Sequence, residues 1–135
     1  MIGKVTLQNE NTRSQKSNNG EISSKISVNG KWDGNTTKKV ENVFRIHEGG
    51  LIKNQKYTDK RYLEQAYSTG WEFKTDHFSE GSTVVKAIQK KVGSEITGFF
   101  DQITIKKLQK FLDVFVNGIL DQKTVEAFQR WLNQQ

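Results

Sequence analysis

The feature that most constrains this chain is a short unit that occurs three times and leads each time into a helical pattern. Each copy reads apolar, polar, Gly, any residue, apolar, Asp, two residues of any type, and Thr, at 28–36, 96–104 and 116–124. Positions 4, 7, 10 and 11 after each Asp are apolar, with Thr37 as the one exception, which places one apolar stripe on each helix. Because a single short helix cannot bury such a stripe alone, the units must pack together.

Each residue type in the unit predicts a structural role. Gly permits positive φ in a tight turn, the apolar residue before Asp is a core anchor, and Asp is a helix N-cap with Thr in the first helical turn. The predicted anchors, caps and first-turn residues are Trp32, Asp33, Thr36, Phe100, Asp101, Thr104, Leu120, Asp121 and Thr124. Capping and anchoring explain these residues without a ligand.

The spacing of the units predicts an all-α protein. We expect helices over 82–92, 101–112 and 121–133. A degenerate copy of the unit lies at 48–55, and we expect residues 57–67 to form the helix that follows it. The segment Trp71–Phe73 is predicted as a loop or a short extended connection. The expected fold is two small three-helix modules after a tail.

The expected domain bounds follow from this pattern. They are a flexible linker or tail at 1–25, a degenerate module at 26–80 and a clearer module at 81–135. The tail is polar and lacks proline, so it is predicted to be a soft tether, with a short strand at 4–7 as its one structured element.

Composition narrows the class of partner. The net charge of +6 favours a polyanion, but it does not separate nucleic acid, anionic lipid and wall polymer. No apolar run approaches the roughly 18 residues of a membrane span, so no membrane partner is expected. The first residues lack a secretory signal, and we expect a protein made in the cytoplasm that acts at the cell wall after something else releases it.

Aromatic residues outside the repeated stripe are the candidate ligand-binding residues. They are Tyr57, Tyr62, Tyr67 and Trp71. Aromatic faces stack on the C–H surfaces of sugars, and the alternative is that these four residues form the core of the first module.

No catalytic, metal or cofactor site is expected. His47 and His77 are the only histidines and cysteine is absent, so the sequence offers no zinc pattern. The acidic residues show no spacing that sets up an acid and a base for glycoside cleavage. Lysine pairs at 38–39, 90–91 and 106–107 are interpreted as solvated helix faces, with contact to wall phosphates as the alternative.

The unit resembles the peptidoglycan-binding domain family. The family signature is Asp-Gly-x-apolar-Gly-x-x-Thr followed by Ala-Leu-Gln, and residues 116–129, VNGILDQKTVEAFQ, are similar to it. The resemblance covers about 26–135. The tandem arrangement of two modules with a linking Gly-Trp segment at Gly70-Trp71 is similar to the C-terminal targeting region of phage endolysins of Gram-positive bacteria. In this chain Asn or Thr stands where the family often has Asp before the glycine, and Asp replaces the second glycine.

The resemblance implies a three-helix bundle that binds peptidoglycan or attached wall polysaccharide. It also implies that a separate catalytic lysin domain does the cutting, so this chain is expected to be a binding part and no enzyme. Two rival functions stay open at this point. One is a basic helical nucleic-acid-binding protein, and the other is an oligomerisation module in which copies of the chain associate. Nucleic acid is not the expected partner, because no recognition-helix signature is present.

Overall fold

The computed structural model describes residues 25–77 and 80–135. The predicted tail, except for Lys25, and its short strand at 4–7 lie outside the described residues. The elements in chain order are α1 (Gly34–Phe44), β1 (Ile52–Lys56), the 3-10 helix η1 (Tyr57–Tyr62), β2 (Trp71–Lys74), α2 (Thr83–Val92), α3 (Gln102–Leu112) and α4 (Gln122–Asn133).

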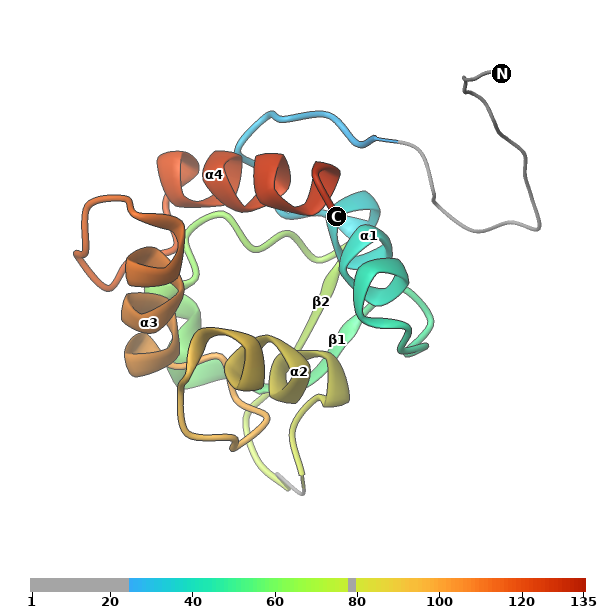
Figure 1. Cartoon of the computed structure of the whole chain (residues 1–135). Helices are drawn as coiled ribbons and strands as arrows, with labels where there is room; N and C mark the ends of the chain where they lie inside the picture. The colour runs from blue at the N-terminus through green and yellow to red at the C-terminus, as the bar shows by residue number, and fades with distance from the viewer. Residues whose placement is uncertain (1–24, 78–79) are drawn as a thin grey trace, which may run out of the picture.

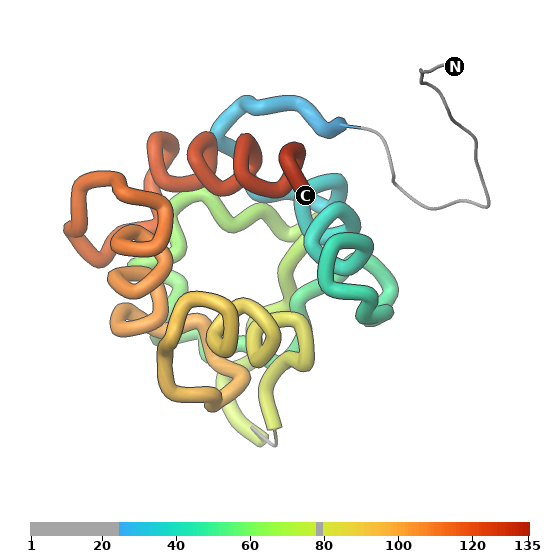
Figure 2. Tube along the Cα trace, viewed as in Figure 1, coloured from blue at the N-terminus to red at the C-terminus, as the bar shows by residue number. Residues whose placement is uncertain are grey.

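The four α-helices of the described part form a closed ring (Figure 1). Each helix contacts the next one along the chain, and α4 returns to contact α1. Figure 2 shows the same path as a trace, with the red end of the chain lying over the blue and cyan beginning. The segment 52–74 crosses behind the ring. The repeated units therefore meet head to tail and leave no unit without a neighbour.

The helix ends follow from capping residues. Asp33, Asp101 and Asp121 are the N-caps of α1, α3 and α4, and each carboxylate accepts a hydrogen bond from the backbone N–H three residues later. Ser82 caps α2 in the same way through Val85. Each of these bonds satisfies an N–H that the first turn of a helix leaves without a partner.

One hydrophobic core fills the ring. The anchors Trp32, Phe100 and Leu120 are fully buried. The Trp32 ring lies with its centroid 5.7 Å from that of Phe100 and 5.1 Å from that of Phe128. These contacts join residues on both sides of position 80 in a single cluster. The division into modules at 26–80 and 81–135 stays a prediction about the sequence units, whose apolar sides share this core.

The prediction of an all-α fold is wrong, because β1 and β2 pair as a two-stranded parallel sheet. Ile52 pairs with Trp71 and Lys56 with Lys74. The sheet places Ile52 and Trp71 in the core while Lys53 points to solvent. The paired residues lie about twenty positions apart in the chain, so no local pattern in 52–74 predicted the pairing of the two strands.

The predicted helix over 57–67 is also shorter than expected. Only Tyr57–Tyr62 is helical, as a 3-10 turn. Beyond it, backbone groups bond to the ring instead of to each other: the Leu120 N–H donates to the Tyr62 carbonyl at 2.8 Å, and the Trp32 N–H donates to the Gln65 carbonyl at 2.9 Å. These bonds across the ring replace the hydrogen bonds that would have continued a helix.

Candidate functional site

Three buried glutamines join the helices of the ring, and the sequence analysis missed them. Gln89, Gln109 and Gln129 lie on α2, α3 and α4, and all three side chains are buried. In the example of Gln109, Oε1 accepts from the backbone N–H groups of Asn117 and Gly118, both at 3.0 Å. Its Nε2 donates to the Ile119 carbonyl at 3.0 Å and to Thr124 Oγ1 at 2.9 Å. One amide therefore satisfies three backbone groups of the Gly turn.

The Gln129 junction closes the ring. Its Oε1 accepts from the N–H groups of Asn29 and Gly30, at 2.9 and 3.0 Å, and its Nε2 donates to the Lys31 carbonyl and to Thr36 Oγ1. The glutamine thus bonds to the turn of the first unit, which lies about 100 residues earlier. A signal was present: Gln109 and Gln129 each lie eight positions after the N-cap Asp. This spacing does not identify the turn that each glutamine bonds to.

Glu41 makes the remaining junction of the ring, at the equivalent position of α1. Its Oε2 accepts from the N–H groups of Glu48 and Gly50, at 3.0 and 2.9 Å. A carboxylate accepts hydrogen bonds as the amide oxygen does, but it donates none. Only the acceptor half of the glutamine junction is present here.

The predicted cap residues take part in these junctions. The Thr104 hydroxyl donates to Asp101 Oδ1 at 2.8 Å, and the Thr124 hydroxyl donates to Asp121 Oδ1 at 2.7 Å. Burial acts to raise the pKa of Asp121, but hydrogen bonds from Thr124 and Asn117 outweigh it and hold the pKa below its usual value. The equivalent cap residues of α1, Asp33 and Thr36, also line a pocket of about 270 Å³.

The segment 55–67 is fastened to the backbone of each anchor. Gln55 is fully buried and its Oε1 accepts from the Phe100 N–H at 2.7 Å. Leu120 and Trp32 are bonded to the backbone at Tyr62 and Gln65, and the Tyr67 N–H donates to the Trp32 carbonyl at 3.0 Å. The ring therefore holds both ends of η1 in place.

The structure separates the four candidate aromatic residues. Trp71 is 2% exposed and lies in the core, edge-on to Trp32 and Phe100, and its Nε1 has no hydrogen-bond partner among the described residues. Tyr62 is half-buried. Tyr57 is 56% exposed and Tyr67 is 41% exposed. Only the last two present a large aromatic surface to solvent.

Tyr57 lines an open pocket on η1. This η1 pocket has a volume of about 510 Å³ and is lined by Tyr57, Thr58, Lys60 and Arg61. Lys60 Nζ lies 5.5 Å from the Tyr57 ring centroid and 5.4 Å from that of Phe73, and the Arg61 guanidinium lies 4.8 Å from that of Tyr62. The neighbouring cations thus keep to the aromatic faces at the pocket. The other three predicted aromatic residues do not line it.

Asp59 lies among these cations on η1. Burial raises the pKa of Asp59, the nearby Asp101 raises it further, and Lys56 and Arg61 act to lower it. The carboxylate is therefore less favoured here than in water. Lys60 and Arg61 give the η1 pocket its positive charge.

The side chains at the η1 pocket are suited to the recognition of a ligand. The Tyr57 face provides an apolar platform, and the hydroxyl, ammonium and guanidinium groups provide hydrogen-bond donors and positive charge. This combination suits a flat ligand with C–H faces and anionic groups. Elsewhere, His77 is bonded to Asp76 at 2.8 Å and His47 lines a different pocket. Among residues 25–77 and 80–135, no His, Cys, Asp and Glu residues gather into a group that could hold a metal ion.

None of the helices in the described ranges is long and apolar enough to cross a membrane. Comparison with known proteins adds no relative from which a role could be transferred. No family model, no curated protein and no solved structure matches this chain.

Proposed function

We propose that this chain is a cell-wall-binding domain that recognises glycan in the bacterial wall through the η1 pocket. The observation that carries the proposal is the exposed Tyr57 face beside Lys60 and Arg61 in an open pocket of about 510 Å³. Wall polymers combine sugar rings with carboxylate or phosphate groups, so an aromatic platform with adjacent cations matches both parts.

The way η1 is held supports this proposal. Backbone bonds from Leu120 and Trp32, together with the buried Gln55, fix the segment on both sides of the pocket. A binding surface that is ordered before the ligand arrives loses less conformational entropy on binding. Weak sugar contacts then suffice for a useful affinity.

The proposed role is to concentrate a lytic domain at its substrate. A domain that binds the wall raises the effective concentration of any attached or associated catalytic domain without contributing chemistry. The ligand in this proposal is peptidoglycan or wall polysaccharide, and the catalytic lysin domain is the partner.

Pelleting with purified Gram-positive walls tests the proposal. We expect the chain to sediment with walls and Tyr57→Ala to bind about tenfold more weakly, on the scale of about 1.4 kcal/mol for one lost aromatic contact. Phe115→Ala is the matched control, because Phe115 is an 81% exposed aromatic residue outside the η1 pocket. Equal loss in both variants, or no pelleting of the unmodified chain, would count against the proposal.

Stripping the secondary polymers from the walls separates the two ligands. Binding that survives stripping assigns the η1 pocket to peptidoglycan, and binding that disappears assigns it to the attached polysaccharide. Either result leaves wall binding in place.

A second candidate function is supported by the same surface. Aromatic faces beside cations also stack and neutralise single-stranded nucleic acid. A gel shift with single-stranded and duplex DNA at about physiological salt distinguishes the two, since nucleic-acid binding falls steeply as salt rises. A shift that Tyr57→Ala abolishes, without wall pelleting, would establish this second function.

A further inference from the structure

A polar pocket lies where the turn of the first unit meets α4 and closes the ring. It has a volume of about 270 Å³, and its lining comes from the described start of the chain, from the beginning of α1 and from α4. We call it the seam pocket. Its polar lining includes Lys25, Ser27, Asn29, Asp33, Asn35 and Gln129.

The third unit contains the same Asn and Asp pair, and there the two side chains bond to each other. Asn117 Nδ2 donates to Asp121 Oδ2 at 3.1 Å, and the Thr124 hydroxyl donates to Asp121 Oδ1 at 2.7 Å. Both oxygens of that carboxylate therefore have side-chain donors. Asn29 and Asp33 stand at the equivalent positions of the first unit.

The pair in the first unit is open. Asp33 Oδ1 accepts from the N–H groups of Asn35 and Thr36, at 3.0 and 3.4 Å, and the Thr36 hydroxyl donates to the Lys31 carbonyl instead of to Asp33. Within residues 25–77 and 80–135, neither Asp33 Oδ2 nor Asn29 Nδ2 has a hydrogen-bond partner. Capping thus uses one oxygen of Asp33, and an acceptor and a donor are left at the seam pocket.

The free donor is held in a fixed position. Asn29 Oδ1 accepts from the Lys31 N–H at 2.9 Å and from Gln129 Nε2 at 3.1 Å, which identifies the other end of the amide as the free N–H donor. Gln129 is 1% exposed and is itself bonded to the Asn29 and Gly30 N–H groups. A ligand would therefore meet groups that are already oriented, which lowers the entropy cost of binding.

The charge and size of the seam pocket favour a small neutral ligand. Lys25 and Asp33 contribute one positive and one negative charge to the lining, so a charged ligand of either sign meets a like charge. The volume of about 270 Å³ far exceeds the roughly 30 Å³ that one water molecule occupies in the liquid. It lies just below the range of pockets for drug-sized ligands, which begins at about 300 Å³.

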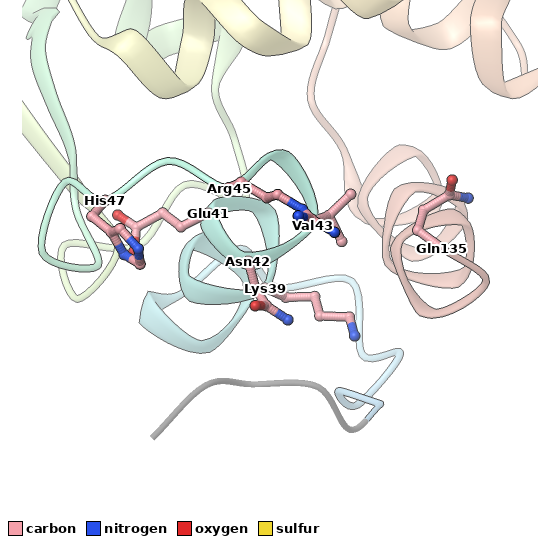
Figure 3. Close-up of a pocket in the computed structure, with 7 residues that line it drawn as sticks. All are labelled: Lys39, Glu41, Asn42, Val43, Arg45, His47 and Gln135. Carbon is pink, nitrogen blue, oxygen red and sulfur yellow. The ribbon is translucent and has the colours of Figure 1, made fainter. Parts of the chain in front are cut away.

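A larger pocket, of about 510 Å³, lies at α1 and the end of α4 and carries charges of both signs (Figure 3). Glu41 Oε2 accepts two backbone N–H groups, and the Gln135 amide donates to a backbone carbonyl of α4. Lys39 and Asn42 also make interactions of their own. Lys39 is only 4% exposed, so the interpretation of 38–39 as a solvated pair is wrong for this residue. These four groups are engaged within the protein, in contrast to the open pair at the seam pocket.

We propose that the seam pocket binds a neutral sugar through its hydroxyl groups. A hydroxyl both accepts and donates, so one sugar oxygen can accept from Asn29 Nδ2 and donate to Asp33 Oδ2. It would make through one oxygen the link that Asn117 and Asp121 make directly. Neighbouring hydroxyls can bond to Ser27 and Asn35 in the same lining. The proposal does not depend on the function of the η1 pocket.

Titration of the full chain with uncharged methyl glycosides of glucose, galactose, mannose and N-acetylglucosamine tests the site. We expect saturable binding of at least one of them, with NMR shifts concentrated at residues 25–36 and at Gln129. Asp33→Asn should weaken it about tenfold, because Asn still caps the helix but places an amide donor where the free acceptor was. Asp121→Asn is the matched control and should leave the affinity unchanged, since it makes the same change in the third unit.

Three outcomes would overturn the proposal. They are no saturable binding of any of the glycosides, equal losses in Asp33→Asn and Asp121→Asn, and binding of acetate or ammonium at these residues as tight as that of the glycosides. Circular dichroism shows whether Asp33→Asn is folded. If it unfolds, Asn29→Asp decides, because it keeps the accepting oxygen but removes the donor. Tyr57→Ala should retain glycoside binding, so a failure of wall binding at the η1 pocket and a failure of this site are distinguishable.

Discussion

The three glutamine junctions and the Glu41 junction satisfy the N–H groups of a turn in the same way, but with different side chains. At each junction an oxygen from one helix accepts hydrogen bonds from two backbone N–H groups of the neighbouring turn in the ring. The glutamines also donate to the hydroxyl of Thr104, Thr124 or Thr36, three positions after the N-cap of the next helix. The helix after Glu41 has Val85 at that position. Where the hydroxyl acceptor is missing, the donor is missing too.

This comparison separates two parts of the junction. The acceptor oxygen is retained in all four, so satisfying the two turn N–H groups is the common requirement. The donor occurs only where a threonine hydroxyl and a turn carbonyl receive it. We infer that residues at the two positions are coupled: an amide goes with threonine, and a carboxylate goes with valine.

The largest expected effect comes from placing a carboxylate in a glutamine junction. Gln109→Glu would put a charge against the Ile119 carbonyl and beside Asp121, whose Oδ1 already accepts from the Thr124 hydroxyl. Oε1 would keep the Asn117 and Gly118 N–H donors, but the second carboxylate oxygen would be buried against acceptors, so we expect a loss of about 3 kcal/mol or more in the free energy of unfolding at neutral pH. Urea denaturation measures it. A loss below about 1 kcal/mol would mean that the donor half of the junction is dispensable.

Removing the side chain that closes the ring should have the next largest effect. Gln129→Ala leaves the N–H groups of Asn29 and Gly30 without their acceptor. We expect a loss of about 2–3 kcal/mol, from the cost of leaving buried polar groups unsatisfied. Hydrogen exchange should speed up at residues 29–31 more than at the 117–118 turn. Uniform acceleration across both turns would contradict a local role in closure.

Converting the Glu41 junction to an amide should cost less. Glu41→Gln keeps the acceptor but adds a donor, and the next helix has Val85 at the position where the other helices have the threonine that receives this donor, so we expect about 1 kcal/mol of destabilisation. Adding Val85→Thr should recover part of this loss, although Val85→Thr alone is destabilising. The double-mutant cycle measures the coupling. Purely additive effects would contradict the proposed coupling between positions 41 and 85.

The smallest effect concerns pH at a glutamine junction. The pKa of Asp121 is lowered in the folded chain, so its ionised form adds stability above the pH at which an unfolded carboxyl titrates, at about 4. That stability is lost as the pH falls through the folded pKa. Asp121→Asn should therefore be less stable at neutral pH by about 1 kcal/mol or less, with the difference vanishing in acid. A difference that grows in acid would contradict the sign.

The sequence pattern predicted the parts of this fold that depend on residues close to one another in the chain. A Gly turn, an N-cap Asp and an apolar stripe are local signals, and the helices expected at 101–112 and 121–133 have Gln102–Leu112 and Gln122–Asn133 as their counterparts. The parallel pairing of Ile52 with Trp71 and the bond from Gln129 to Asn29 join distant residues. Periodicity does not reveal such partners.

The same limit applies to the candidate site. Tyr57 and Trp71 are both aromatic residues outside the repeated stripe, and nothing in the sequence distinguished them. Pairing with β1 takes Trp71 into the core, while the turn at η1 leaves Tyr57 exposed beside Lys60. Lys39 and Gln135 lie far apart in the chain, so their shared pocket depended on the closure of the ring.

The contact of α4 with α1 limits how a chain of this kind could gain further repeated units. An open-ended solenoid can lengthen by inserting repeats, and it needs special end repeats to cover its exposed faces. Here Gln129 on α4 bonds to the turn of the first unit, so each unit in the described part has a neighbour on both sides and no cap is required. An added unit would have to break that bond, which makes the number of units in the circle a fixed property of the fold.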